Sequence, residues 1–517
     1  MAINTLFGSY RGAMIAPTDC VNEEGAPAYA LTPKQALAQY AATGCFGRTF
    51  YASEQEQLSR VLQLCDAAGA EFVAKVAIYS RRRSYMKDMP ALLCAWLSLR
   101  SPQLHEVVFA NVIDGMKMLR NYVQILRSGA VGRKSLGTAP KRLVQTWLAT
   151  KDEETIFRSS TGANPSVADI LKMVHPKPSN KTRDAFYGYM IGKTVDNSAL
   201  PGLVTEFERF KAGESMDVPD VPFTLLTSLP LSQKDWATVA LRASWQTVRM
   251  NLNTFARHGA FKELGVTERV ALLLRDRAEI QRARVFPYQL MAAYRNCDQS
   301  VPPEVRNSLQ DAMEIALQNV PAVAGKVYVC PDVSGSMRSP VTGYRKGAST
   351  AVQCVDVAAL VAAAILARNQ SAEVLPFESD VVTVDLNPRD TVLTNAARLA
   401  AVGGGGTNCS APVRLLNQRQ AKGDLIVFIS DNQSWVDAGR GLGTALMQEW
   451  AGFRQRNPSA QLICLDVQPG STTQVTERED ILNIGGFSDH VFEVMAAFSA
   501  GELEPDHWVA AIEAVEV

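Results

Sequence analysis

The chain has 517 residues, of which 47% are hydrophobic and 20% are charged, so it can bury a large core and should hold more than one domain. Its nine cysteines are scattered with no Cys-x-x-Cys pair, which argues against a disulfide framework or a zinc ribbon and for a reducing compartment, which we take to be the cytoplasm. The longest strongly apolar run, 357–367, is too short to cross a membrane, and the N-terminus lacks the pattern of a signal peptide, so we expect a soluble protein.

The net charge of zero hides an asymmetry along the chain. Residues 1–325 carry 38 Lys and Arg against 30 Asp and Glu, whereas residues 326–517 carry 14 against 22. The basic excess is concentrated in residues 75–183, which hold 19 basic and 7 acidic side chains. An excess this sustained predicts that the first part binds a polyanion, with nucleic acid as the leading candidate.

Residues 1–30 are turn-rich, and we expect them to form an arm laid over the domain. From residue 32 to about 320 the pattern is helical, because apolar residues recur on one face and Pro, Gly or Asn separate the segments. The expected helices are 54–67, 71–80, 90–99, 104–127, 139–150, 166–174, 233–259 and 302–319. With hardly a strand among them, this part is predicted to be an all-α array of stacked helix pairs.

Several basic side chains of the helical part are candidates for nucleic-acid contact. Arg48 lies in a Gly-bounded turn beside two aromatic residues, where it can stack on a base. His175 follows a predicted helix that stops at His-Pro-Lys-Pro, and Lys172 and Lys177 flank it. A histidine in that position can also simply cap the last carbonyls of its helix. The remaining candidates, about half of which should be plain solvated surface, are Arg133, Lys134, Lys141, Arg142 and Arg158.

From residue 326 the pattern alternates between strands and helices, which is typical of a doubly wound α/β domain. The expected strands are near 326–331, 372–376, 381–386, 424–430, 461–467 and 490–494. The expected helices are near 349–368, 390–401, 410–420, 438–456 and 505–515. The Pro-containing segment 320–325 is the natural boundary, so the predicted domains are 1–325 and 326–517.

Oxygen-bearing side chains gather at three places in this second domain. An Asp and two Ser at alternate positions follow the first strand, a Thr follows four consecutive glycines, and an Asp ends the apolar strand near 424–430. In open α/β sheets ligands bind at the carboxyl ends of the strands, and carboxylate and hydroxyl oxygens suit Mg²⁺ rather than zinc or copper. The sequence therefore predicts a site for one Mg²⁺ ion, made by Asp332, Ser334, Ser336, Thr407 and Asp431.

This set of residues resembles the metal-ion-dependent adhesion site of von Willebrand factor A domains. The resemblance implies that Ser334, Ser336 and Thr407 coordinate Mg²⁺, and that Asp332 and Asp431 support the ion, partly through water. No position of the pattern is missing.

The helical part is similar to the Ro autoantigen family, whose helical region is called the TROVE module. The stretches that carry this resemblance are 128–143, 168–178, 247–252 and 284–288. A TROVE module followed by a von Willebrand A domain is the order found in that family, and the compact chain with few insertions favours a bacterial member.

The Ro resemblance implies an architecture and a function. HEAT-like helical repeats are expected to close into a ring whose central hole takes single-stranded 3′ ends of misfolded RNAs, with Arg48 near the landmark that faces the hole. The outer surface is expected to bind small noncoding Y RNAs through the positions of Arg158 and His175. The protein is then a monomeric, non-enzymatic scaffold for noncoding RNA quality control that works with an exoribonuclease.

Two alternatives stay open at the level of the sequence. A nuclease or NTPase is conceivable because Mg²⁺ is predicted on a nucleic-acid-binding chain, but 129–135 is only a near miss to a P-loop. A hydroxyl-rich site for a single ion also differs from the paired carboxylates that hold two metals for phosphodiester hydrolysis. A protein-interaction scaffold would instead use the ion's open position to capture an Asp or Glu of a partner, and this role can coexist with RNA binding.

Overall fold

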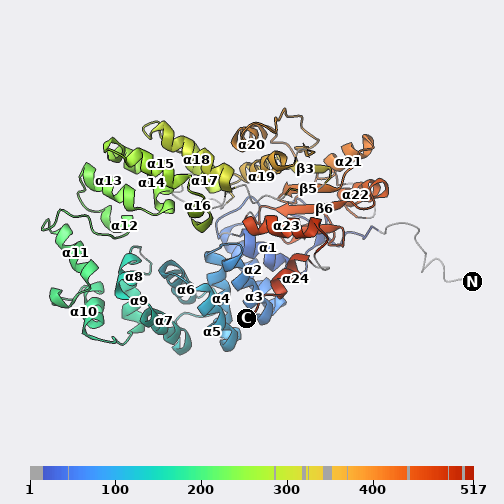
Figure 1. The fold of residues 1–517 in the computed structure, drawn as a ribbon. Helices are drawn as coiled ribbons and strands as arrows, with labels where there is room; N and C mark the ends of the chain where they lie inside the picture. The colour runs from blue at the N-terminus through green and yellow to red at the C-terminus, as the bar shows by residue number, and fades with distance from the viewer. Residues whose placement is uncertain are drawn as a thin grey trace, which may run out of the picture. The chain divides into compact units, whose positions relative to one another are not determined.

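The structure is a computed structural model that describes residues 15–517 except 45, 163, 284–286, 317–321, 324, 342–351, 370, 439–442, 487 and 503–506. The chain divides into two compact units, which Figure 1 shows with their helices and strands. Unit 1 comprises Met1–Ala68 and Asn319–Ala514, and unit 2 comprises Gly69–Gln318 and Val515–Val517. This division differs from the expected boundary near 325 because the described residues of the segment 15–68 pack with the α/β domain.

Unit 2 is helical throughout, as predicted: within its described residues there is no strand. Successive helices pack against each other, for example α3 on α4, α4 on α5 and α17 on α18. The helices are α3 (Ala70–Arg82), α4 (Asp88–Arg100), α5 (Pro102–Val112), α6 (Met116–Ser128), α7 (Thr138–Thr150), α8 (Glu153–Arg158), α9 (Val167–Val174), α10 (Lys181–Met190), α11 (Gly202–Lys211), α12 (Phe223–Leu226), α13 (Gln233–Arg242), α14 (Trp245–Arg257), α15 (Val266–Leu274), α16 (Arg277–Ala283), α17 (Pro287–Arg295) and α18 (Pro303–Ala316).

Two helices that were expected to be continuous are each divided in two. The segment 104–127 breaks between α5 and α6, and the segment 233–259 breaks between α13 and α14. At the second break the Ser244 hydroxyl accepts a hydrogen bond from the backbone N–H of Thr247, an amide that has no partner inside its helix. The local capping interaction thus starts a new helix within a segment whose apolar periodicity continues.

Unit 1 holds a five-stranded parallel sheet in the order β4 (Glu373–Val374), β3 (Val327–Pro331), β5 (Leu425–Ser430), β6 (Gln461–Asp466) and β8 (Ile481–Gly485). The residues of β3 and β5 are all buried, as expected for central strands that are covered on both faces. The doubly wound α/β fold predicted for this part of the chain is confirmed.

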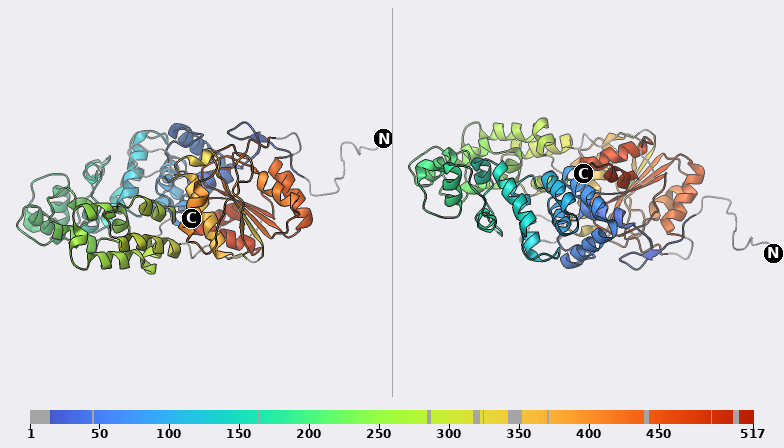
Figure 2. Two further views of the ribbon diagram at one scale, coloured as in Figure 1. Left: turned by 90° about the horizontal axis from the view of Figure 1, so that it is seen from above. Right: turned by 90° about the horizontal axis from the view of Figure 1, so that it is seen from below.

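Helices cover both faces of this sheet. On one face α21 (Ala411–Gln418) and α22 (Ala445–Arg456) lie together, drawn in orange in Figure 2, and Trp450 and Phe453 belong to the same core cluster as Phe428 of β5. Because neighbouring residues of a strand point to opposite faces, Val427 faces the other side, where α19 (Cys354–Arg368) packs against β3 and β5. The remaining helices are α20 (Val392–Ala400), α23 (Asp489–Ser499) and α24 (His507–Glu513).

Two predicted strands of this domain were wrong. The segment 490–494 lies in α23, where Val491, Met495 and Phe498 are buried at helical spacing, and β8 supplies the last strand of the sheet instead. The described segment 381–386 forms only an isolated bridge from Val381 to Phe377. The neighbouring strand β4 is only two residues long, so it offers almost no edge for a further strand to pair with.

Residues 15–30, the described part of the expected arm, lie on the α/β domain together with the residues that follow them, and from here on the arm means residues 15–68. Strand β1 (Cys20–Val21) pairs with β2 (Pro27–Ala30), and β2 in turn pairs antiparallel with β7 (Thr472–Thr473). Helix α1 (Pro33–Thr43) begins with a capping box, has eight buried residues, and packs against β8, α24 and α2 (Glu54–Ala68).

No helix of the described part of the chain is long and apolar enough to cross a membrane. None of the eight cysteines that the structure describes is in a disulfide, in agreement with their scattered positions in the sequence.

Candidate metal centre and nucleic-acid surface

The two carboxylates of the predicted metal site emerge side by side from neighbouring strands. Asp332 directly follows β3 and Asp431 directly follows β5, and these parallel strands pair in register up to Pro331 and Ile429. The backbone N–H of Asp332 donates to the Ile429 carbonyl at 2.9 Å, which extends this pairing to the site itself.

The hydroxyls of the site are arranged around these carboxylates. The backbone N–H of Ser334 donates to Oδ1 of Asp332 at 2.8 Å, and the Oγ atoms of Ser334 and Ser336 are 3.4 Å apart. The Ser336 side chain lies beside the Asp431 carboxylate. Ser430, which sequence reasoning missed, donates its hydroxyl to Oδ2 of Asp332 at 2.6 Å.

The glycine run folds directly against the loop that follows β3. The N–H of Gly404 donates to the Val333 carbonyl at 2.8 Å, and a Cβ atom added at Gly403, whose φ is +82°, would lie 2.3 Å from that carbonyl oxygen. Only a residue without a side chain fits such an approach. The Thr407 carbonyl then accepts from the N–H of Trp435 at 3.0 Å, so Thr407 reaches the loop that begins at Asp431.

Electrostatics at this site favours a bound cation. All five predicted ligands are buried, with at most 7% of any of them exposed. Burial away from water, and then the charge of Asp431, raises the pKa of Asp332, and burial likewise raises the pKa of Asp431. Oδ2 of Asp431 is buried and has no hydrogen-bond partner in the described part of the protein. A divalent cation would compensate both carboxylates, and the mixed hydroxyl and carboxylate donors fit Mg²⁺.

The basic residues at the end of α9 are exposed to solvent. Lys172, His175 and Lys177 are all exposed, and His175 adopts a left-handed backbone conformation with φ of 48° that ends the helix. The carbonyl of Val174 accepts a hydrogen bond from Nε2 of Gln145 at 2.5 Å. Gln145 and the backbone N–H of His175 hydrogen-bond to carbonyls in the last turn of the helix. The imidazole of His175 is exposed to solvent, where a ligand can reach it.

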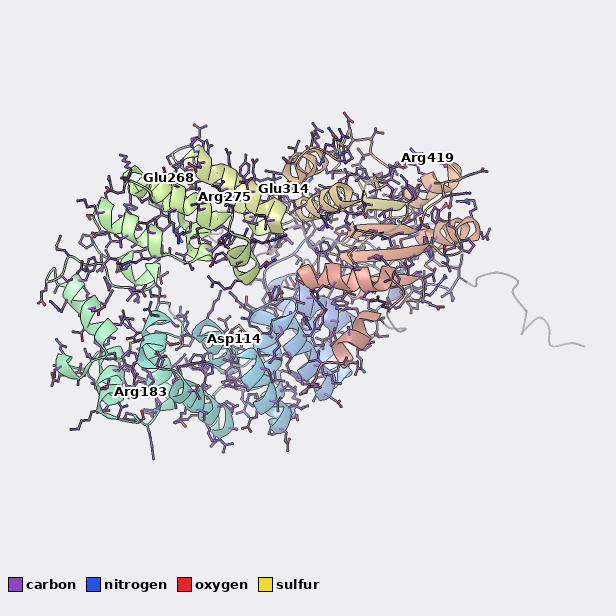
Figure 3. All side chains as sticks on the ribbon, in the orientation of Figure 1. Asp114, Arg183, Glu268, Arg275, Glu314 and Arg419 are labelled. Carbon is purple, nitrogen blue, oxygen red and sulfur yellow. The ribbon has the colours of Figure 1, made fainter. Side chains whose placement is uncertain are left out.

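Other basic candidates are engaged in the fold. The guanidinium of Arg133 donates to the carbonyls of Leu136 at 2.9 Å and Ser98 at 3.2 Å, so Arg133 organises its loop. Arg158 forms an ion pair of 3.0 Å with Asp220. Arg183, labelled in Figure 3, is likewise engaged in the fold, because it is buried and forms an ion pair with Glu153.

The four remaining candidates differ in their surroundings. Lys134 and Arg142 are exposed, and Lys141 is half-buried. Arg48 is also exposed, but it belongs to unit 1, whereas the sequence had suggested the helical part.

Comparison with known proteins now bears on both units. Residues 326–499 match the family model of the Ro60 vWA domain. A protein of Deinococcus radiodurans named RNA-binding protein RO60 is 24% identical over 533 residues, covering 93% of this chain and 95% of the relative. The chain is therefore similar to Ro proteins over nearly its whole length. The crystal structure of the Deinococcus radiodurans RO (RSR) protein has the same fold, with a TM-score of 0.62 and 21% identity over 91% of this chain and 100% of that chain.

The stretches that suggested the Ro family have different roles in the structure. The stretch 168–178 contains α9 and its exposed basic end. In the stretch 247–252, Arg249 donates to the Gln289 carbonyl at 2.8 Å, and burial lowers the pKa of Arg249 to about 10, so this part of the resemblance reflects packing. Residues 284–286 lie outside the described part of the chain.

Further polar residues beside the candidate metal centre were missed from the sequence. Asp466 is the last residue of β6, as Asp431 is the residue directly after β5, and the Asp466 carboxylate bonds to the Asn432 amide and accepts from Nε2 of Gln39 at 2.8 Å. The same signal, a carboxylate at the tip of an apolar strand, could have identified Asp466. The contact with Gln39 had no local signal, because 427 positions separate the two residues.

Proposed function

We propose that this chain is an RNA-binding protein that takes RNA on the exposed basic end of α9. The observation that carries the proposal is the alignment of 93% of the chain with a relative named an RNA-binding protein. Charge supports it, because unit 2 holds 34 Lys and Arg against 25 Asp and Glu. Phosphate contacts dominate the affinity of proteins for nucleic acids, so a net positive unit with exposed cations suits such a ligand.

The proposal extends to the class of RNA. The Ro resemblance of 168–178 supports binding of a structured small noncoding RNA of the Y type at Lys172, His175 and Lys177. We assign a second ligand, single-stranded 3′ ends of misfolded RNA, to a separate surface to which Arg48 contributes. In this role the protein is a monomeric cytoplasmic scaffold, and an associated exoribonuclease performs the cleavage.

We further propose that Asp332, Ser334, Ser336, Thr407 and Asp431 hold one Mg²⁺ ion. The support is the buried pair of carboxylates, one of them with an oxygen that accepts no hydrogen bond in the described part of the chain. When bound, the ion supplies positive charge that stabilises the ionised form of both carboxylates. The serine and threonine hydroxyls orient around this position, and nothing in the donor set requires a reaction at the ion.

The test of RNA binding removes the basic end of α9 while preserving its backbone. The variant combines Lys172→Ala and Lys177→Ala with His175→Asn, because asparagine tolerates the left-handed conformation at a helix end. The control combines Lys234→Ala and Lys262→Ala, which removes the same number of exposed lysines elsewhere in unit 2. Both proteins are compared with the wild type by filter binding at several salt concentrations.

The α9 variant is expected to bind a structured small RNA more weakly, and the slope of log K against log salt should fall by about 1.8 for two lost phosphate contacts. An RNA whose only feature is a single-stranded 3′ tail should retain its affinity. Equal weakening by the control variant would show that the protein has one diffuse basic surface and would overturn the assignment to α9.

A further inference from the structure

The arm formed by the N-terminal residues is attached to the loop that carries Asp431. Nδ2 of Asn22 donates to the Ser434 carbonyl at 2.6 Å, and the backbone N–H of Glu23 donates to Oε1 of Gln433 at 3.0 Å. These contacts join positions more than 400 residues apart in the sequence. The arm is therefore held directly beside the metal centre, inside unit 1.

Tyr51 is the residue of this arm that reaches the metal centre. It stands in a tight turn in which the N–H of Thr49 donates to the Ala52 carbonyl at 2.9 Å. Its hydroxyl lies beside the Ser336 side chain, and its ring is partly buried.

The cavity between Tyr51 and Asp431 is small. Tyr51 and Asp431 line the same cavity, together with Gln433 and residues of the arm, and its volume is about 10 Å³. One water molecule needs roughly 10–15 Å³, so the cavity holds at most one water and has no room for a carboxylate side chain. The burial of all five predicted ligands agrees with a site that is covered.

We infer that Tyr51 closes the accessible side of the metal centre, so that bulk water and carboxylates of other proteins are excluded from an ion held there. The inference rests on the proposed Mg²⁺ site and adds a positioning residue that no motif of that site contains. It assigns the ion an internal role, because the ion, Ser336 and Tyr51 then connect the arm to the α/β sheet. Capture of a partner's Asp or Glu at this site, the role of a protein-interaction scaffold, is thereby rejected.

Manganese in place of Mg²⁺ gives a direct readout, because bound Mn²⁺ speeds the relaxation of water protons that exchange at the ion. The full chain loaded with Mn²⁺ is titrated with acetate, a small carboxylate probe. In the wild type the relaxation enhancement should be low and unchanged by acetate. In Tyr51→Ala it should be higher and should fall as acetate displaces water. Tyr51→Phe keeps the ring and should behave like the wild type.

Two controls separate closure by Tyr51 from loss of the site. Phe50→Ala removes the neighbouring ring, which is 52% exposed and does not line the cavity, and should leave the enhancement unchanged. Ser334→Ala should abolish Mn²⁺ binding. An enhancement in the wild type that acetate reduces overturns the inference while leaving the metal site intact. Failure of the wild type to bind Mn²⁺ overturns the metal site and the inference with it.

Discussion

His105 shows how a single buried side chain connects the stability of the fold to pH. Its Nε2 lies 2.7 Å from the Tyr122 hydroxyl, the two rings are stacked, and both residues are buried. Burial, with a smaller effect from Arg133, lowers the pKa of His105 from 6.5 to about 4. The folded protein therefore keeps the imidazole neutral over a pH range in which the unfolded chain takes up a proton.

A histidine whose pKa is lower in the folded state stabilises the fold fully above pH 6.5, and this contribution is lost as the pH falls towards 4. At about 1.4 kcal/mol for each pKa unit, the loss amounts to about 3 kcal/mol. His105→Gln should reduce the pH dependence of the free energy of unfolding by that amount, as measured by urea denaturation between pH 7 and pH 4. His175→Asn removes an exposed imidazole and serves as the control. An unchanged pH dependence in His105→Gln would contradict this assignment.

At the scale of elements, the von Willebrand A domain extends beyond the segment 326–499 that the family model matches. Helix α1 packs on β8 and α24, and β2 adds to the short strand β7. Leu37 of α1 is fully buried and Tyr40 is 1% exposed. Burial of a large apolar side chain stabilises by about 1.5–3 kcal/mol, so the arm contributes substantially to this unit.

We therefore expect a fragment of residues 326–517 to be less stable than the same fragment produced together with residues 15–68. The separate fragment should show a lower thermal midpoint and more binding of a dye that detects exposed apolar surface. An arm that carries Leu37→Asp is the matched control and should fail to restore either property, because a charge would replace a buried leucine. Equal thermal midpoints with and without the arm would show that the sheet is complete on its own.

At the scale of the whole molecule, the excess of basic residues and the proposed metal site belong to different units. Unit 1 holds 18 Lys and Arg against 27 Asp and Glu, the reverse of the excess in unit 2. The proposed ion therefore lies in the acidic unit, whereas the proposed RNA surface at α9 lies in the basic one. Enzymes that cut phosphodiester bonds with two metals need carboxylates that bridge the ions near the substrate, and the donors of this site are buried and suit one ion.

Purified protein with Mg²⁺ should accordingly leave labelled RNA intact on a denaturing gel, and it should release no phosphate from nucleotides. Asp332→Ala should lose the metal while keeping its affinity for structured RNA, because the exposed cations of α9 do not depend on the ion. Cleavage by the wild type that disappears in Asp431→Ala would establish a nuclease in place of the scaffold.

The clustering of the five side chains proposed to hold Mg²⁺ could be predicted because its signals are local. Asp332 and Asp431 follow apolar strands directly. The glycines before Thr407 indicate that their backbone lies close to another segment, which is the loop after β3. Helices in unit 2 could be predicted from apolar spacing, but the break at Ser244 depends on one side chain that caps the next turn. The same apolar residues in 490–494 suit a strand or a helix, and packing of Val491 and Phe498 decides for the helix.

The position of the arm could not be predicted because its contacts are distant in the sequence. Pairing of Tyr29 with Thr473 involves strands too short to leave a pattern. In the sequence Tyr51 is only one of the two aromatic residues beside Arg48, and its place beside Ser336 follows from the turn at Thr49 and from the docking of Asn22 and Glu23. Such contacts become visible only when the whole chain is folded.

The discontinuity of unit 1 also sets an order of events during synthesis on the ribosome. Its first 68 residues are made before the 250 residues of Gly69–Gln318, and their partners β7 and β8 are made last. At roughly 5–20 residues per second, the arm waits for tens of seconds with the apolar side chains of α1 unprotected. The helical unit can fold during this delay because its contacts are local. We therefore expect nascent chains of this protein to expose the apolar side chains of α1 for a long period, in which chaperones can bind them.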